Sequence, residues 1–147
     1  METNQLDLWP VMTATASTQD TPVSILRSQA ALLEKKTGGL VMADVKRRNV
    51  EVPEIIYAVT KAGVKEDNAQ NVFAYSFYLI APALDKYRYM LFWVLHPIEM
   101  YPLLIRDSPE GEFKVESENE FLEVLRRIFG SQKTQRVIQS MIAQSNS

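Results

Sequence analysis

The sequence contains no cysteine and a single histidine, His96. Without cysteine the chain forms no disulfide, carries no thiolate nucleophile and binds no metal through sulfur. A zinc site needs several ligands at defined spacing, and a catalytic histidine needs a partner that orients it. We therefore expect neither a metal site nor a catalytic residue. His96 stands before Pro97 at the end of a predicted strand, where we expect a partly exposed side chain.

Glycine is also scarce, with five residues in the chain. None of them forms the GxGxxG or GxxxxGK[ST] pattern that cradles phosphates, and no serine stands in GxSxG. These absences predict a protein without a nucleotide cofactor and without enzymatic activity. A hydrolase that uses two carboxylates stays open as an alternative, although nothing marks two particular acids as a pair.

The chain has neither an excess of basic charge nor a long hydrophobic run. Its formal net charge is -2 and its pI is about 5.5, which argues against general binding of nucleic acid. The most apolar stretch, residues 90–95, is far shorter than the roughly 20 residues of a membrane-spanning helix. The first ten residues have no basic region followed by an apolar core, so we expect no signal peptide and a cytoplasmic protein.

The 147 residues are a common size for one domain, and 46% of them are hydrophobic, which is enough for a core. Residues 1–20 are rich in polar side chains without apolar periodicity. We predict a flexible N-terminal arm over 1–20, whose apolar residues could dock on the domain, and a single domain over 21–147. These apolar residues are Leu6, Leu8, Trp9 and Val11.

The first predicted helix starts at Thr21, an N-cap residue followed by Pro22. An apolar stripe with helical spacing follows, and Gly38 and Gly39 end the helix. Alternation then predicts a strand over residues 40–50. Residues 49–71 are interrupted by Pro53, and we expect an irregular excursion with a short edge strand or a helical turn, followed by a loop over 61–71.

Two aromatic strands, residues 72–81 and 87–96, are the strongest signal, and a third follows over 101–106. Both faces of the first two strands are apolar, which is unusual for a sheet with one solvated side. In the second strand, alternation places five side chains on one face: Tyr87, Tyr89, Leu91, Trp93 and Leu95. It places three on the other: Met90, Phe92 and Val94.

The C-terminal part predicts an αα-hairpin. Ser117 and Glu120 form a capping-box pattern, Gly130 ends the first helix, and Ser131 caps the second. We interpret the acidic stretch 107–120 as a solvated loop, which could alternatively attract a cation or a basic partner. Four cations on the hairpin are read as ordinary surface charge or, alternatively, as a patch for an acidic partner; they are Arg126, Arg127, Lys133 and Arg136.

Together these elements predict an α+β fold in which an N-terminal helix and a C-terminal αα-hairpin pack on an antiparallel sheet of about four strands. Three amphipathic helices can cover one apolar face of that sheet. The second face then needs the 49–71 segment, the N-terminal arm or another copy of the protein to cover it.

The aromatic residues of the sheet are the candidate binding residues. They are Tyr75, Tyr87, Tyr89, Trp93 and Tyr101. Aromatic sheets can stack nucleic-acid bases, but only Lys86 and Arg88 supply basic charge here. Tyrosine and tryptophan are also enriched at protein interfaces. We therefore expect a non-enzymatic protein-interaction module, a homo-oligomer or the partner of another protein. The alternative is a small-molecule binder, with a pocket between sheet and helices lined by Tyr75, Tyr89 or Trp93.

The sequences TPVSILRSQA at 21–30, YLIAPAL at 78–84 and YRY at 87–89 resemble a family of small bacterial proteins of unknown function. The resemblance extends over most of residues 21–144 and is weaker in 49–71. It implies a bacterial source, and it carries no activity and no residue roles.

Overall fold

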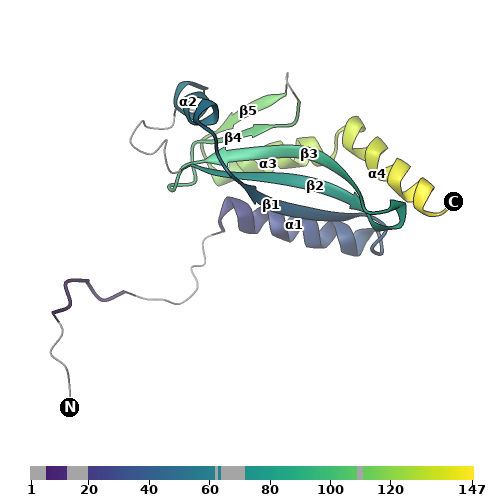
Figure 1. Cartoon of the computed structure of the whole chain (residues 1–147), viewed down its shortest axis with the longest axis horizontal. Coiled ribbons are helices and arrows are strands. Elements are labelled where there is room, and N and C mark those ends of the chain that lie inside the picture. Colours follow the sequence, from purple (N-terminus) through teal and green to yellow (C-terminus); the bar gives the residue numbers. More distant parts are fainter. Residues whose placement is uncertain (1–5, 13–19, 62, 64–71, 109–110) are drawn as a thin grey trace, which may run out of the picture.

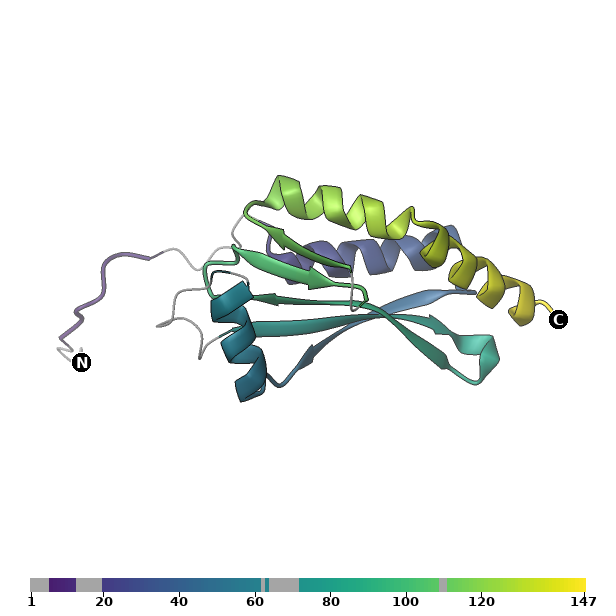
Figure 2. The ribbon, with the colours of Figure 1, turned by 90° about the horizontal axis from the view of Figure 1, so that it is seen from above.

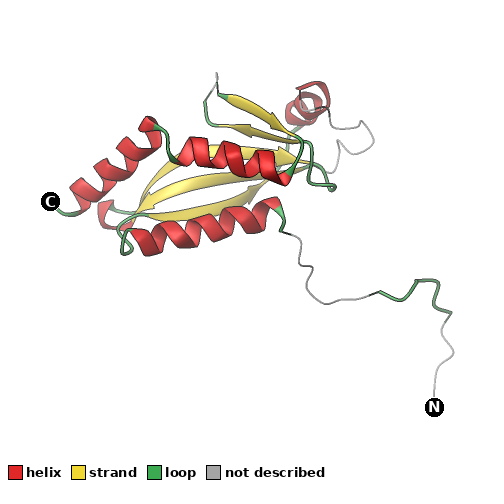
Figure 3. Ribbon diagram, turned by 180° about the vertical axis from the view of Figure 1, so that it is seen from behind, coloured by secondary structure: helices red, strands yellow, loops and turns green. Residues whose placement is uncertain are grey.

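The computed structural model describes residues 6–12, 20–61, 63, 72–108 and 111–147. The fold is α+β: an N-terminal helix, a five-stranded antiparallel sheet and two C-terminal helices packed on it (Figures 1 and 3). The elements in chain order are α1 (Pro22–Lys36), β1 (Met42–Arg48), α2 (Val52–Lys61), β2 (Phe73–Ala81), the 3-10 turn η2 (Pro82–Leu84), β3 (Tyr87–His96), β4 (Leu103–Arg106), β5 (Glu112–Val115), α3 (Glu118–Phe129) and α4 (Gln132–Ser145). The predicted fold class is confirmed.

The sheet is a simple meander with strand order β1-β2-β3-β4-β5, so each strand pairs with its neighbours in sequence. The fifth strand was not predicted. Its residues lie inside the acidic stretch that we interpreted as a loop, yet Phe113 pairs with Ile105 and Val115 with Leu103. The interpretation is wrong there because two inward apolar residues stabilise a strand whose outward residues are charged.

Local signals place α1 where the sequence predicts it. The Thr21 hydroxyl accepts a hydrogen bond from the Ser24 amide at 3.1 Å, and the Ser24 hydroxyl accepts one from the Thr21 amide at 2.9 Å. After the helix, Gly39 has φ of +82°, a conformation that glycine adopts without steric cost. Capping at one end and glycine at the other therefore set the length of α1.

The three helices α1, α3 and α4 all lie on one face of the sheet, as Figure 2 shows. The main hydrophobic core is the layer between them and the sheet. It includes Phe77 and Phe92 from the two central strands, with ring centroids 4.9 Å apart, and Phe121 from α3. All three side chains are at most 2% exposed.

The opposite face, here called the second face, is covered at one end by α2 (Figure 2). A smaller core there contains Val72, Ala74, Leu95 and Leu104, with Tyr57 of α2 packed against it. The helix α2 replaces the irregular segment expected from Pro53. Proline is tolerated in the first turn of a helix because its missing amide needs no partner there. The predicted loop over 61–71 lies, apart from Lys61 and Gly63, outside the described residues.

A β-bulge in β3 corrects the predicted faces of that strand. Phe77 pairs with Phe92, but the next residue, Tyr78, pairs with Met90, which leaves Leu91 as the extra residue. Leu91 and Phe92 both enter the main core. Beyond the bulge the alternation is inverted, so Trp93 lies on the face opposite to Tyr87 and Tyr89. Sequence alternation alone does not reveal a bulge.

Candidate functional site

The five predicted aromatic residues do not form one surface. Tyr75 is buried in the main core, and Trp93 packs against the smaller core of the second face. Tyr101 lies before β4 and packs against the main core. Only Tyr87 and Tyr89 come together at a surface, where both line one groove.

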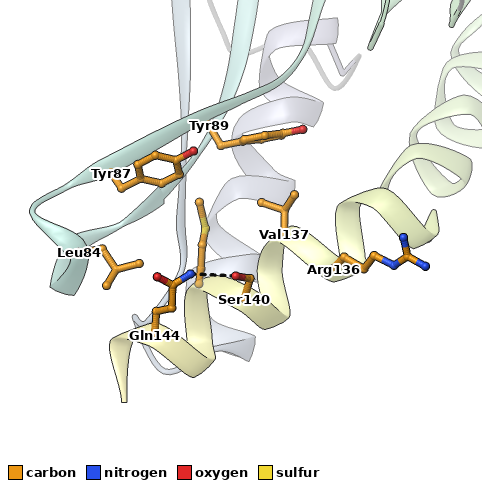
Figure 4. A pocket seen from close by; sticks show the side chains of 8 residues that line it. Leu84, Tyr87, Tyr89, Arg136, Val137, Ser140 and Gln144 are labelled. Carbon is orange, nitrogen blue, oxygen red and sulfur yellow. Dashed lines mark hydrogen bonds between the residues drawn. The ribbon is translucent and has the colours of Figure 1, made fainter. Parts of the chain in front are cut away.

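This groove lies between the end of the β2–β3 hairpin and α4, and we call it the hairpin groove. It has a volume of about 420 Å³. The hairpin supplies Leu84, Tyr87 and Tyr89, and α4 supplies Arg136, Val137, Ser140, Met141 and Gln144 (Figure 4). Arg136 is the one charged residue among the eight.

The helical repeat of α4 explains the two-sided lining. Val137 and Met141 are four residues apart and form an apolar row, and Met141 is 3% exposed. Arg136, Ser140 and Gln144 form a parallel polar row at the same spacing, in which the Gln144 side-chain amide donates a hydrogen bond to Ser140 Oγ at 2.9 Å. The groove therefore has an apolar wall and a polar rim.

The direction of α4 depends on the joint before it. The Ser131 hydroxyl accepts a hydrogen bond from the Thr134 amide at 3.2 Å and donates one to the Ile128 carbonyl at 2.8 Å. Thr134 is 2% exposed although it is polar, and its hydroxyl lies 3.0 Å from Ser131 Oγ. This network ties the start of α4 to the end of α3 and so positions the groove wall.

Part of β3 beside the groove has an unpaired edge. The chain turns from β2 to β3 at Asp85 and Lys86, which both have positive φ. Tyr87 at the start of β3 pairs with Ala81 at the end of β2. On its other side β3 pairs with β4 at Trp93–Leu95 only. Within the described chain, no strand pairs with that side of residues 87–91, so their outward backbone groups are available to another chain.

Tyr87 is the most exposed of the hairpin's aromatic residues, with 52% of its surface accessible. Its neighbour on the opposite face of the strand, Met90, is 49% exposed. Tyr89 is half-buried at the groove floor. An exposed ring beside an unpaired strand edge offers a partner both apolar surface and backbone hydrogen bonds.

A second, smaller pocket lies between α1 and α4. Its volume is about 220 Å³, and its lining is mainly apolar. The lining residues are Gln29, Leu32, Leu33, Lys36, Phe77, Leu79, Leu91, Phe129, Thr134, Gln135 and Ile138. Neither Tyr75, Tyr89 nor Trp93 belongs to this pocket, although Tyr89 lines the hairpin groove.

The half of the second face that α2 leaves open forms a mixed patch. Met42 pairs with Ile80, and Tyr78 pairs with Met90. Across this patch Arg88 bridges Asp44 at 3.2 Å, and its guanidinium carbon lies 4.4 Å from the centroid of the Tyr78 ring. The ion pair neutralises the charge of the patch within one chain.

His96 is buried rather than partly exposed, which corrects the sequence prediction. It is 6% exposed and stacks on Phe73 and Tyr75, with ring centroids 5.4 and 6.0 Å away. Its Nδ1 donates to the Pro97 carbonyl at 2.7 Å, and its Nε2 has no hydrogen-bond partner among the residues that the structure describes. Burial lowers the pKa of His96, and the bond to Pro97 opposes this.

The charged stretches are divided among several elements. Glu118 and Glu120 lie in the first turn of α3, and Glu112 lies in β5. Among the described residues no group of three histidine or acidic side chains could hold a metal ion. Of the basic residues, Arg136 lines the hairpin groove, whereas the guanidinium carbon of Arg127 lies 5.6 Å from the centroid of the Phe113 ring.

In the described part of the chain no helix is both long and apolar enough to cross a membrane. Comparisons with family models, with curated proteins and with solved structures found no match to this chain.

Proposed function

We propose that this protein is a non-enzymatic interaction module that binds an extended chain segment in the hairpin groove, and that it associates with itself in this way. The observation that carries the proposal is the edge of residues 87–91, which no other strand of the described chain pairs with, beside an apolar groove. Strand addition to such an edge supplies backbone hydrogen bonds, and an adjacent groove selects the side chains.

Several features of the groove favour a peptide over a compact polar ligand. The apolar row of α4 faces the Tyr87 and Tyr89 rings, and one cation lies at the rim. Tyrosine binds partners at low entropic cost because its ring has few rotatable bonds. The polar row formed by Arg136, Ser140 and Gln144 offers hydrogen bonds around the margin.

The test compares two charge substitutions on opposite faces of β3. Tyr87→Glu places a carboxylate in the groove, and Met90→Glu places one on the second face at a residue of almost equal exposure. Sedimentation of the full chain is expected to give a mass near twice 16.8 kDa for the unsubstituted protein. Tyr87→Glu is expected to weaken self-association at least tenfold, and Met90→Glu much less.

Circular dichroism and the melting temperature check that each variant is folded. If sedimentation shows a monomer at all concentrations, the proposal that the protein associates with itself through the groove is wrong. Loss of association in Met90→Glu alone would instead assign the contact to the patch that contains Met90 and the Asp44–Arg88 pair.

A second candidate function is binding of a small apolar molecule between α1 and α4. It is favoured by the pocket of about 220 Å³, which has an apolar floor and Lys36 among its lining residues. The anionic apolar dye 1-anilinonaphthalene-8-sulfonate is a suitable probe. Its fluorescence is expected to rise with the folded protein and to fall in Leu32→Lys, but not in Ile98→Lys, a control at an exposed apolar residue elsewhere. Equal signals from both variants would argue against this pocket.

A further inference from the structure

The N-terminal residues 6–12 contain an unusual concentration of exposed apolar side chains. Leu6, Leu8, Trp9, Val11 and Met12 are each at least 66% exposed. Single exposed apolar residues are ordinary, but five within seven residues mark a segment that binds something. Figure 1 shows that this segment lies away from the sheet and the helices.

The chemistry of this segment suits strand addition at the hairpin groove. A residue that precedes proline is restricted to extended conformations, which applies to Trp9 before Pro10. The Trp9 amide donates to Asp7 Oδ1 at 3.0 Å, a local bond that must open before this amide can pair with a strand and the carboxylate can meet a cation. Pro10 has no amide hydrogen, so it ends a run of backbone pairing. Residues 6–9 are thus a short strand-forming unit of a length comparable with residues 87–91.

Alternation assigns the two faces of such an added strand. Trp9 and Asp7 would point to the same side, and Leu6 and Leu8 to the other. When Trp9 lies in the groove beside Tyr87, Asp7 points to the same side. Asp7 carries the one charge of residues 6–12, and Arg136 carries the one charge of the groove lining, with the opposite sign. Leu8 then lies on the opposite side of the added strand, away from the groove. The face of the strand that carries Trp9 and Asp7 therefore meets a surface of matching character.

The length of the connecting chain favours a second copy as the source of the segment. Residues 13–20 number eight, and eight residues span at most about 26–29 Å when fully extended. The segment leaves from the start of α1, whereas the groove lies past the other end of that helix (Figures 1 and 2). A helix of 15 residues is about 22 Å long. Docking within one chain would consume nearly the whole connection, whereas the groove of a second copy can lie closer to the start of α1.

We infer that residues 6–12 of one copy bind in the hairpin groove of a second copy, by adding a strand to the free edge of β3. This inference rests on the proposed function and names its partner. Reciprocal exchange of the two segments closes a symmetric dimer, which leaves neither groove vacant.

The experiment uses the full chain and a synthetic peptide of residues 1–12. Leu8→Ser/Trp9→Ser is expected to weaken self-association at least tenfold in sedimentation, matching Tyr87→Glu. The control Ile98→Ser, at a side chain that is 61% exposed, is expected to leave it unchanged. Excess peptide is expected to dissociate the dimer, whereas a peptide with the same double substitution is not.

Trp9 provides a direct spectroscopic signal, because the peptide carries its own indole. Its emission is expected to shift to shorter wavelength on binding to the Leu8→Ser/Trp9→Ser chain, in a saturable manner that Tyr87→Glu abolishes. Arg136→Glu is expected to weaken binding of the peptide, and Asp7→Lys in the peptide is expected to restore part of it.

The outcomes separate the inference from the proposed function. If Tyr87→Glu abolishes self-association but the N-terminal double variant does not, the groove has another occupant and the inference is wrong. If the full chain is a monomer whose Trp9 is shielded at every concentration, the segment docks on its own chain, and the exchange between copies is excluded. If the double variant dissociates the dimer and Tyr87→Glu does not, the segment binds elsewhere, and both proposals are wrong.

Discussion

Arg48 and Glu54 connect the sheet to α2, with the Arg48 Nη2 atom 2.6 Å from the Glu54 Oε2 atom. The Arg48 guanidinium also lies 5.3 Å from the centroid of the Trp93 ring on the second face. One side chain thus contacts both Trp93 of β3 and Glu54 of α2. This arrangement explains why α2 covers the end of the sheet where β1 finishes.

Glu54→Gln is expected to loosen α2 without unfolding the domain. The hydrogen bond from Arg48 is the largest cause of the lowered pKa of Glu54, ahead of opposing desolvation. A partly exposed ion pair contributes about 0.5–1 kcal/mol, so hydrogen exchange of the α2 amides is expected to accelerate about two- to fivefold. Glu51→Gln, which removes a charge from the turn before α2, is the control.

The pH dependence of the Glu54 contribution has a definite sign. Because the folded state lowers this pKa below 4.5, the pair stabilises α2 above that pH and is lost as the pH falls through the folded pKa. The difference in exchange between the protein and Glu54→Gln should therefore vanish in acid. A difference that persists there would mean that the pair acts by packing alone.

His96→Asn is expected to reduce the loss of stability in mildly acidic solution. Burial lowers the pKa of His96 in the folded state, so the unfolded chain binds a proton first as the pH falls below about 6.5. Stability therefore declines below that pH and levels off below the folded pKa. Asparagine keeps a donor for the Pro97 carbonyl but does not titrate. Urea unfolding between pH 7 and 5 should show a flatter profile in the variant, whatever its overall stability.

Tyr101→Phe is expected not to destabilise the protein at neutral pH, because the buried hydroxyl has no hydrogen-bond partner in the described part of the chain and its burial is costly. Burial, with a further contribution from Glu118, raises the pKa of Tyr101 to about 12. The unfolded chain releases this proton near pH 10, so stability is lost as the pH rises from 10 to 12. Phenylalanine should reduce that alkaline loss in thermal unfolding, and an unchanged profile would contradict the assigned pKa.

Ser131→Ala is expected to destabilise the protein more than Ser117→Ala. Ser117 caps α3 through one hydrogen bond, to the Glu120 amide at 3.3 Å, which is worth about 1 kcal/mol. Ser131 also bonds the Ile128 carbonyl and the buried Thr134 hydroxyl. Chemical denaturation measures both costs. Only Ser131→Ala is also expected to weaken self-association, because that joint positions α4 at the groove.

Capping chemistry was predictable at several helix ends, and its details were not. Thr21 and Ser131 cap their helices as the sequence indicates. The Ser117–Glu120 pair is not a reciprocal box, because the Glu120 carboxylate accepts from the Glu116 amide instead of the Ser117 amide. The reciprocal box occurs at Thr21–Ser24, where a serine takes the place of the usual glutamate. Local sequence specifies that a cap forms, while the rotamer decides which amide it satisfies.

Most of the sheet was also predictable, because aromatic and β-branched alternation is a strong local signal. The two missed elements have opposite causes. In β5 the outward acidic residues hide the inward pair Phe113 and Val115, and in α2 Pro53 reads as a break although it lies in a first helical turn. Both elements can be recognised only when the neighbouring strand or the core that buries their apolar side chains is known.

The sequence by itself therefore determined most of the element types, the positions of several caps and turns, and the apolar character of both sheet faces, since these depend on residues close together in the chain. Tertiary structure decided which aromatics meet. The bulge at Leu91 places Trp93 on the face opposite to Tyr89. Because β4 pairs only with Trp93–Leu95, the edge beside Tyr87 has no strand partner within the described residues. Register and pairing length are set by contacts between distant segments, so the groove against α4 exists only in the folded chain.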